Sequence, residues 1–365
     1  MFARKRSWVV AGTALAIVAS LLVGCSSAAT PTSQASDTTV PESPTTGAAT
    51  TVPGNSPTAG AAATNSGKTY RVAMVTSGPT NDHGFNQNAL EGIQLIHDQL
   101  GWETAYSENV SASQQQNVLR QYAQQKYDLI FAHGYEWGDS LAAVAKDFPQ
   151  VMFVQVNATT KGDNIIGTAF KFGELGYFTG MAAGLMTKNN KIGIVCAEDS
   201  PSNNADLDTM KLGAAAANPN AEVNVSYVGS WDDVVKGQQV TQAQIDRGVD
   251  TLIIMGDAFT PPAIKLAQSK GIKVIGGWSG DNYSLAPDTV ITSGVQEIPG
   301  VYLEVARDFQ AGKLKGNTTI VTGFKEGTQH LGKWGDFVPQ DVKDKVEKAV
   351  QDYLAGNLDI GVKFD

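Results

Sequence analysis

Short apolar runs alternate with helix-like patterns from Arg71 to the end of the chain, and this alternation limits the possible folds. We predict strands at 71–76, 128–132, 151–156, 191–196, 222–228, 251–255 and 273–275. Helical patterns lie between them, among them 87–100, 139–147 and the Gly- and Ala-rich segment 172–188. Nearly continuous apolar strands that alternate with helices indicate parallel sheets covered on both faces. The segment 68–365 is long enough for two such sheets, and therefore for two lobes.

The N-terminus has the pattern of a bacterial lipoprotein signal. Residues 4–6 are basic, an apolar run covers 9–23, and Gly24 precedes Cys25. The apolar run is too short for a comfortable membrane span, which favours a cleaved signal peptide over residues 1–24. We therefore expect lipid on Cys25 and a protein anchored at the extracytoplasmic face of the cell membrane. An ordinary signal peptide or membrane anchor with a chance cysteine is the alternative.

The segment that follows Cys25 has the composition of a linker. Residues 26–67 are almost entirely Ala, Thr, Ser, Pro and Gly, with very few charges. Such a segment cannot bury enough apolar surface to offset the entropy of ordering it. We expect residues 25–67 to be a lipidated, disordered tether for the folded region that begins at Lys68.

Charge and cysteine content exclude several classes of function. The net charge is −9 and no basic stripe is present, so we expect no nucleic-acid partner. Cys25 and Cys196 are the only cysteines, and lipid on Cys25 leaves no internal disulfide. Cys196 ends an apolar strand and is expected to be a small buried side chain.

Catalytic and metal-binding patterns are also missing from the sequence. The 4 histidines lack metal-ligand spacing, so no metal site and no cofactor are expected. Neither a Gly-x-Ser-x-Gly elbow nor a phosphate-binding Gly-x4-Gly-Lys-Ser/Thr loop occurs. Asp232 and Asp233 are adjacent carboxylates that suit the first turn of a helix better than catalysis. We therefore expect a protein that is not an enzyme.

The segments that follow the predicted strands are the places to search for a binding site. In open parallel sheets, ligands bind beyond the carboxyl ends of the strands. These segments are rich in aromatic and hydrogen-bonding side chains, namely Phe85, Asn86, Tyr135, Trp137, Asp139, Trp231, Asp257, Trp278 and Asp281. A cleft lined in this way would stack a flat ligand and bond its polar edges.

Several sequence blocks are shared with one known family. Residues 82–86 read Asp-His-Gly-Phe-Asn, and further matching blocks lie at 134–139, 174–188, 227–233 and 248–250. In these blocks the chain resembles the basic membrane protein family of bacterial lipoproteins, which are purine-nucleoside-binding components of ABC importers. The resemblance implies a two-lobed periplasmic-binding-protein type I fold, with a parallel sheet flanked by helices in each lobe and a ligand cleft between the lobes.

The resemblance also implies roles for individual residues. Phe85 would stack on one face of a purine, and Asn86 would form a hydrogen bond with its edge. Trp231 lies where the family commonly has a second aromatic residue, and it would cover the other face. Asp139 would accept hydrogen bonds from ring nitrogens. Stacking of this kind is worth about 1–3 kcal/mol per base, and carboxylates favour a nucleoside over a nucleotide.

One block departs from the family pattern. Where the family usually has Ile-Gly, one or two residues and Asp-Ser-Asp, this chain has Gly-Gly-Trp-Ser-Gly-Asp-Asn at 276–282. Asp281 then matches either the second family aspartate or the residue after it, which leaves recognition of a ribose open. Trp278 adds an aromatic ring that could restrict the pocket to a free base or change the class of ligand.

Structural roles remain open for several of these residues. Asp82 and Asp139 could each cap the helix that follows, because an aspartate accepts hydrogen bonds from the free amides of a first turn. An aromatic residue in a loop can instead fill a gap in the core, and this alternative applies to Phe85, Trp231 and Trp137. A structural role is also an alternative for Tyr135 and Asp257.

We predict that lobe 1 comprises residues 68–172 with a return at about 293–321. Lobe 2 comprises 173–292 and about 322–365. The expected function is that of an extracytoplasmic substrate-binding lipoprotein of an ABC importer. It would capture a purine nucleoside or related purine by hinge closure, as a monomer, and deliver it to a membrane permease. The alternatives are a ligand-sensing surface lipoprotein and an importer component for another small molecule, such as a sugar.

Overall fold

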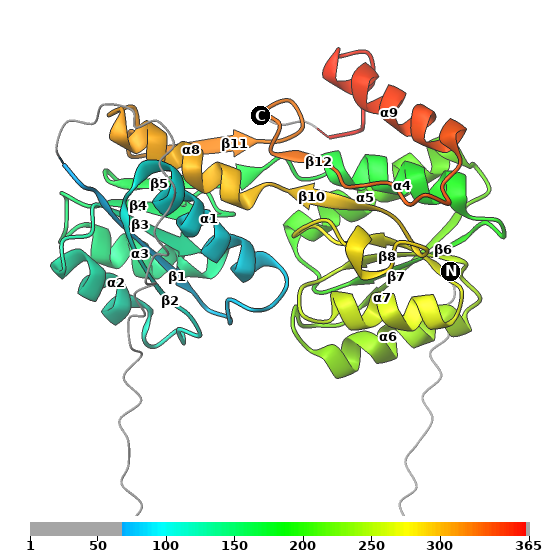
Figure 1. Ribbon diagram of the computed structural model, residues 1–365, viewed down its shortest axis with the longest axis horizontal. Helices are drawn as coiled ribbons and strands as arrows, with labels where there is room; N and C mark the ends of the chain where they lie inside the picture. The colour runs from blue at the N-terminus through cyan, green and yellow to red at the C-terminus, as the bar shows by residue number, and fades with distance from the viewer. Residues whose placement is uncertain (1–67, 363–365) are drawn as a thin grey trace, which may run out of the picture. The chain divides into compact units, whose positions relative to one another are not determined.

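The computed structural model describes residues 68–362, which contain two six-stranded sheets. The first sheet has the order β11-β5-β4-β3-β1-β2, and all its strands are parallel. Its strands are β1 (Arg71–Thr76), β2 (Glu103–Ser107), β3 (Leu129–His133), β4 (Met152–Val156), β5 (Ile165–Phe170) and β11 (Thr318–Thr322). The helices packed on it are α1 (Phe85–Leu100), α2 (Gln115–Gln124), α3 (Gly138–Ala145) and α8 (Ile298–Gln310), preceded at α3 by the short η1 (Tyr135–Trp137) (Figure 1).

The second sheet has the order β12-β10-β9-β8-β6-β7, and only β12 runs antiparallel to its neighbour. Its strands are β6 (Lys191–Cys196), β7 (Glu222–Tyr227), β8 (Thr251–Met255), β9 (Lys273–Gly276), β10 (Val290–Gln296) and β12 (Gln329–Leu331). Its helices are α4 (Glu174–Met186), α5 (Pro201–Ala217), α6 (Val234–Asp246), α7 (Thr260–Ser269), α9 (Gln340–Leu354) and the short η2 (Tyr283–Leu285). Among the described residues, no helix is long and apolar enough to cross a membrane.

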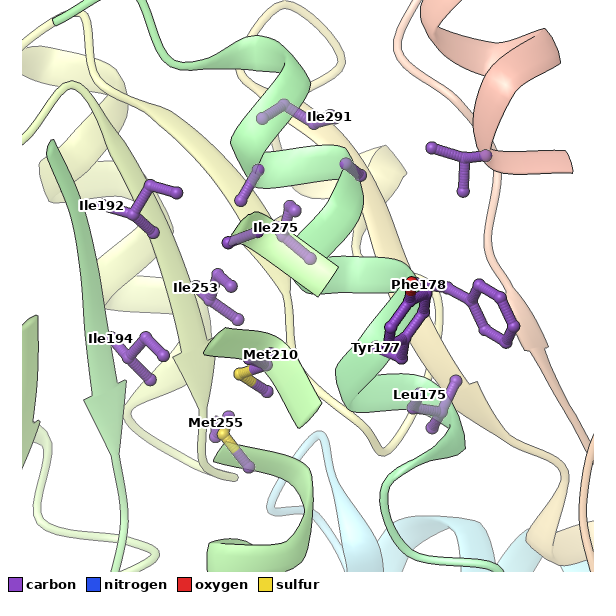
Figure 2. Packing of buried hydrophobic residues seen from close by; sticks show 14 of the residues in the cluster. Leu175, Tyr177, Phe178, Ile192, Ile194, Met210, Ile253, Met255, Ile275 and Ile291 are labelled. Carbon is purple, nitrogen blue, oxygen red and sulfur yellow. The ribbon is translucent and has the colours of Figure 1, made fainter. Parts of the chain in front are cut away.

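Each sheet has an apolar core on both faces, because successive side chains of a strand point to opposite sides. On β6, Ile192 and Ile194 face α4 and α5, whereas Val195 faces α6 and α7. Figure 2 shows the α4 side of this sheet, where Leu175 and Phe178 belong to the same buried cluster as its isoleucines. Cys196 is buried on the same side, as expected, and burial raises the pKa of its thiol to about 12.

The small residues of α4 allow close packing against α5. A Cβ atom at Gly180 would lie 2.1 Å from the carbonyl oxygen of Met210. In the opposite direction, a Cβ atom at Gly213 would lie 1.9 Å from the carbonyl oxygen of Tyr177. No real Cβ approaches backbone so closely, so the Gly and Ala content of 172–188 sets the distance between the two helix axes.

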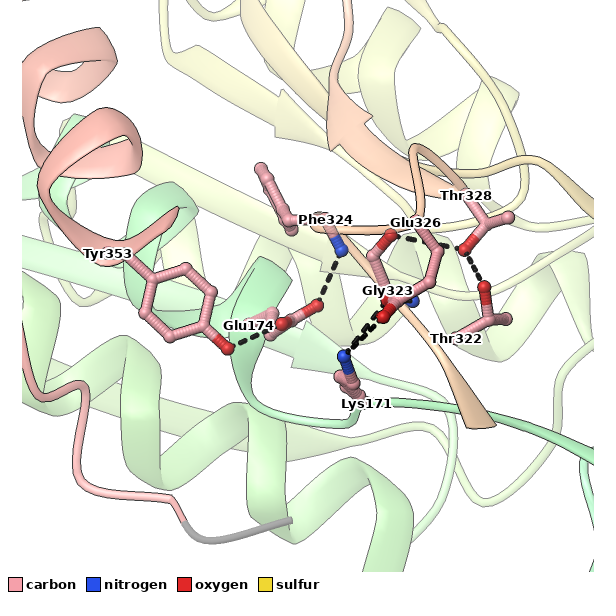
Figure 3. Close-up of polar contacts among 8 residues, drawn as sticks. All are labelled: Lys171, Glu174, Thr322, Gly323, Phe324, Glu326, Thr328 and Tyr353. Atoms are coloured by element: carbon pink, nitrogen blue, oxygen red, sulfur yellow. Dashed lines mark hydrogen bonds and ion pairs between the residues drawn. The ribbon is translucent and has the colours of Figure 1, made fainter. Parts of the chain in front are cut away.

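The chain crosses between the two sheets three times within residues 68–362: after β5, after β10 and after β11. The crossing segments are bonded to one another. The Lys171 amide donates to the carbonyl of Thr322, and its ammonium group contacts both carboxylate oxygens of Glu326 at 2.9 Å (Figure 3). The amide of Glu297 donates to the carbonyl of Thr328 at 2.8 Å. These contacts tie all three connections into one hinge region.

A buried carboxylate anchors this hinge region to the C-terminal helix. Glu174 is fully buried at the start of α4, and it accepts hydrogen bonds from the Phe324 amide and from the Tyr353 hydroxyl of α9 (Figure 3). Burial is the largest cause of the raised pKa of Glu174, and the two donors act against it. The pair of donors therefore compensates part of the cost of burying this group.

Changing Tyr353 to Phe is expected to lower the free energy of unfolding by about 1–3 kcal/mol, because buried Glu174 loses a hydrogen-bond donor. Chemical denaturation of the purified chain measures this change. Tyr177→Phe is the matched control, since Tyr177 lies on α4 in the same core and its hydroxyl has no hydrogen bond within the described part of the chain. Equal effects of the two substitutions would contradict the role given to the Tyr353 hydroxyl.

The predicted strands and helices agree with the structure to within a few residues, but β2, β5, β10, β11 and β12 were not predicted. The sequence predicts a return to lobe 1 near Ser293, but Ser293 pairs with Gly276 inside the second sheet, and the chain leaves that sheet only after Gln296. The predicted signal peptide, lipidated Cys25 and linker lie outside the described residues.

Candidate ligand-binding site

A pocket of about 370 Å³ lies where the carboxyl ends of the strands of both sheets meet. Its walls come from the segments after β1, β3, β4, β5, β6, β7, β8 and β9 and from the end of β10. This is the position at which open parallel sheets bind ligands, and the volume falls within the usual range of about 300–1,000 Å³ for small-molecule sites. Six of the ten predicted ligand-binding residues line it: Phe85, Asn86, Tyr135, Trp231, Asp257 and Trp278.

Phe85 is held in place by a buried histidine. The Phe85 ring stacks on the His133 ring with centroids 3.6 Å apart and an interplanar angle of 27°. His133 Nε2 lies 2.9 Å from the carbonyl oxygen of Phe85, which can only accept, so Nε2 carries the proton and donates. Nδ1 then accepts from the hydroxyl of Tyr302 at 2.9 Å. Burial lowers the pKa of His133 to about 3, which keeps the ring neutral.

Asp82 caps helix α1 and does not line the pocket. Its carboxylate accepts hydrogen bonds from the backbone amides of Gly84, Asn86 and Gln87, each at 2.9 Å. It also accepts from the Asn86 side-chain amide at 2.8 Å. These contacts are those of a helix cap, which was the alternative role for Asp82. They also orient the Asn86 side chain and leave its Oδ1 as an acceptor that faces no donor among the described residues.

Trp278 is fixed by Asp206, a buried carboxylate of α5. The Trp278 indole nitrogen donates to Asp206 at 2.8 Å, and the Gly173 amide donates to the same side chain at 2.7 Å. Burial raises the pKa of Asp206 to about 6, while these hydrogen bonds act in the opposite direction. The pocket wall formed by Trp278 is therefore braced from α5 and from the β5–α4 crossing.

Asp257 connects the loop after β8 to the start of α1. Its Oδ1 accepts from the Phe85 amide at 3.2 Å and from the Ser279 hydroxyl at 3.1 Å. A Cβ atom at Gly84 would lie 2.3 Å from this oxygen, so the contact requires a glycine there. Oxygens of Asp82, Asp232 and Asp257 lie within 4.8 Å of one another. Burial is the largest cause that raises the pKa of Asp257 to about 7, and the negative charge of Asp82 is the second.

Three further predicted residues lie away from the pocket. Trp137 is fully buried in the core between the first sheet and α2 and α3. Asp139 is exposed in the first turn of α3, with no hydrogen bond that caps the helix. Asp281 organises the loop after β9, where it accepts from the backbone amides of Tyr283 at 3.0 Å and Lys333 at 2.8 Å. Tyr135 does line the pocket, at its mouth, and is 68% exposed.

The structure adds pocket residues that the sequence did not single out. Most of them end a strand or follow one within two residues. They are His133, Asn157, Phe172, Glu198, Asp206 and Gln296. Asn157 comes immediately after β4, and this position beyond a strand end could have marked it as a pocket residue. Asp206 could not be found in this way, because it lies within helix α5.

Residues 69–360 match the family described as PnrA-like ABC transporter substrate-binding proteins (Bmp). The chain belongs to this family, which confirms the resemblance seen in its sequence blocks. Proteins of this class bind a small molecule and work with a membrane permease. The family consists of solute-binding proteins.

Relatives in the family carry different names. The chain is 28% identical over 288 residues to the transcriptional activator protein med of Bacillus subtilis, with 79% of this chain and 89% of the relative covered. It is 30% identical over 305 residues to a putative ABC transporter glucose-binding protein of Haloferax volcanii (81% and 75% covered). It is also 30% identical over 293 residues to a purine-binding protein of Brucella abortus (79% and 82% covered).

Solved structures confirm the expected fold. An ABC transporter solute-binding protein from Aeropyrum pernix K1 superposes with a TM-score of 0.71 at 20% identity, covering 80% of this chain and 92% of that one. The fold is the two-lobed periplasmic-binding-protein type I fold, with two mainly parallel sheets flanked by helices.

Proposed function

We propose that this chain is the extracytoplasmic substrate-binding lipoprotein of an ABC importer and that it captures a purine nucleoside or a related purine. The observation that carries the proposal is the pocket at the strand ends of both sheets, where Phe85 and two tryptophans stand beside hydrogen-bond acceptors. Flat aromatic walls suit a base, and acceptors suit its amino and imino groups and ribose hydroxyls. A purine-binding relative at 30% identity supports the same ligand class.

Ligand capture would proceed by closure of the two lobes about the hinge region. Phe85 and Asn86 belong to the segment at the start of α1, whereas Trp231, Asp257 and Trp278 belong to loops of the second sheet. A ligand that touches both sets binds the closed arrangement better than an open one, and this difference drives closure. The three crossings, at about 170–174, 296–298 and 322–329, allow such a movement without breaking either sheet.

The remaining parts of the proposal concern anchoring and partners. We infer that Cys25 carries lipid, that residues 25–67 tether the folded part to the membrane, and that the protein acts as a monomer and not as an enzyme. Its partners would be the ligand, the permease subunits and the membrane. Lobe 1 would comprise residues 68–172 and about 297–322, with the rest of the described chain in lobe 2.

A sugar is the second candidate ligand, and one observation favours it. Trp278 projects into the pocket from the segment that departs from the family pattern, and tryptophan faces also stack on sugar rings. A relative at 30% identity is named as a putative glucose-binding protein. A ligand-sensing role is a further alternative, since one relative is named as a transcriptional activator.

Calorimetric titration and thermal unfolding of the full-length chain in detergent would test the ligand class. Bound molecules are first removed by unfolding and refolding. The ligands are adenosine, guanosine, inosine, xanthosine and their bases, with glucose, galactose and amino acids for comparison. At a hundredfold excess over its dissociation constant, a true ligand stabilises the folded state by about 2.7 kcal/mol. Stabilisation by glucose without any response to purines would replace the purine proposal with the sugar alternative.

A further inference from the structure

We propose that this pocket selects donor-rich ligands that are neutral or cationic, and that among purine nucleosides it favours those with an exocyclic amino group over those with acidic oxo groups. This inference rests on the proposed function for its choice of purines. It concerns selectivity within the pocket and follows from the charges and unpaired atoms of the wall.

The charged side chains that line the pocket are all acidic. Its wall contains Glu136, Glu198, Asp206, Asp232 and Asp257, and none of the described lining residues is Lys or Arg. His133 contributes no positive charge, because burial lowers its pKa to about 3. An anion in this pocket would lose its hydration and meet several carboxylates without a cation to balance its charge.

Two acceptors of the wall have no donor from the described part of the chain. The Oδ1 atom of Asn157 is buried and has no hydrogen-bond partner among residues 68–362. Asn157 also has a left-handed backbone, with φ of 56°, at the end of β4. In the same described part of the chain, no side chain donates to the carboxylate of partly exposed Glu198. A buried acceptor without a donor is costly, so a ligand N–H or O–H group gains most at Asn157. At Glu198 it would make a charge-assisted hydrogen bond.

Several donors of the wall are already engaged with protein carboxylates. The Trp278 indole nitrogen donates to Asp206 at 2.8 Å, and the Ser279 hydroxyl donates to Asp257 at 3.1 Å. The Asn86 amide donates to Asp82, outside the pocket. A ligand rich in carbonyl oxygens would compete with these carboxylates for the same donors. The wall therefore suits a ligand edge made of N–H and O–H groups.

Pairs of purine nucleosides that differ in one ring substituent allow this selectivity for donor-rich ligands to be measured. Guanosine has an amino group where xanthosine has an oxo group, and xanthosine loses a proton near neutral pH. At pH 8 xanthosine therefore brings both an acceptor in place of a donor and a negative charge. At pH 5 xanthosine is neutral and carries an N3–H donor, while Asp206 and Asp257, with pKa values of about 6 and about 7, take up protons. Both the charge penalty and the mismatch of donors and acceptors are therefore smaller at pH 5.

The experiment measures dissociation constants of the full-length chain in detergent for guanosine, xanthosine, adenosine and inosine at pH 5 and pH 8. We expect xanthosine to bind about tenfold or more weakly than guanosine at pH 8, with a smaller gap at pH 5. Adenosine should bind more tightly than inosine at both pH values. Xanthosine that binds within twofold of guanosine at pH 8 would overturn the inference.

A charge-removing variant tests whether the wall causes the selectivity. Glu198→Gln is expected to improve xanthosine binding at pH 8 by about threefold or more and to narrow its gap to guanosine. Glu347→Gln is the matched control, because Glu347 is exposed on α9 and lies outside the pocket. Equal guanosine-to-xanthosine ratios in the two variants would overturn the role of the wall.

Glucose and glucuronate separate the failure of this inference from the failure of the proposed function. If no purine binds but glucose does, the purine proposal fails, and the selectivity inference then requires glucuronate to bind at least tenfold more weakly than glucose. Equal binding of these two sugars would overturn it. Absence of binding by every purine and every sugar overturns both proposals.

Discussion

Replacement of Phe85 with alanine is expected to weaken purine-nucleoside binding by about 5- to 150-fold, since stacking on an aromatic side chain is worth about 1–3 kcal/mol per base. The ring is pre-positioned by its stack on His133 at 3.6 Å, and the Phe85 carbonyl is bonded to the same imidazole. A base that enters the pocket therefore meets a ring that is already held in one orientation, which limits the entropy cost of binding. Isothermal titration calorimetry with the best purine ligand measures the loss.

Phe85→Tyr is the matched control, because it keeps the ring and should retain binding within a few-fold. Phe85 also packs at the edge of the α1 core, so the unfolding temperature of each ligand-free variant must be measured in parallel. If Phe85→Ala remains folded and binds with unchanged affinity, this ring does not stack on the ligand. The base would then have to contact Trp231 or Trp278 alone.

Replacement of Asp257 with asparagine is expected to stabilise the ligand-free protein at pH 8 and to flatten the dependence of its stability on pH. The pKa of Asp257 is about 7 in the folded chain, against an ordinary value of 3.8. Between these values the folded state binds a proton that the unfolded state has released, so stability decreases as the pH rises from about 4 to about 7. Above pH 7 the folded chain must hold a buried charge beside Asp82 and Asp232.

Asparagine carries no charge and still offers an oxygen to the Phe85 amide and the Ser279 hydroxyl. We expect Asp257→Asn to raise the unfolding temperature by about 4 °C or more at pH 8 and by little at pH 5, as measured by scanning calorimetry. Asp206, whose pKa is raised to about 6, should cause a smaller decrease of stability with rising pH in both the wild type and the variant. Asp98→Asn, which alters an exposed carboxyl on α1, should leave the profile unchanged. Parallel profiles for wild type and Asp257→Asn would contradict this assignment.

Most central strands could be predicted from the sequence because they are apolar on both faces. The segments of β1, β6 and β8 have almost no polar residue, and their bounds agree with the prediction. Five strands were not predicted, namely β2, β5, β10, β11 and β12. β2 and β11 are edge strands with exposed polar residues, and β10 carries Thr292 and Ser293, whose hydroxyls bond to neighbouring loops at Gly332 and Asp281. Their strand character depends on neighbours that are distant in the sequence.

The candidate site could be predicted as a set of loops, but the direction of each side chain could not. Tyr135 and Trp137 lie two residues apart in one turn, yet Tyr135 is 68% exposed at the pocket mouth and Trp137 is fully buried in the core. The 3₁₀ turn sends them to different sides, and composition alone carries no information on this. Asp206 was missed for the opposite reason, since its place beside Trp278 depends on how α5 packs beneath a distant loop.

A single recombination event cannot exchange one lobe of this protein for that of a relative. The described chain passes between the sheets at three places. With a single breakpoint after β5, strand β5 would come from one parent and its partner β11 from the other. With a single breakpoint after β10, strands β10 and β12 would come from different parents. A working chimera needs three junctions, together with matching partners for Lys171, Glu297 and Glu326 at those junctions. New ligand preferences in such a chain are therefore expected to arise through substitutions in the loops at the strand ends.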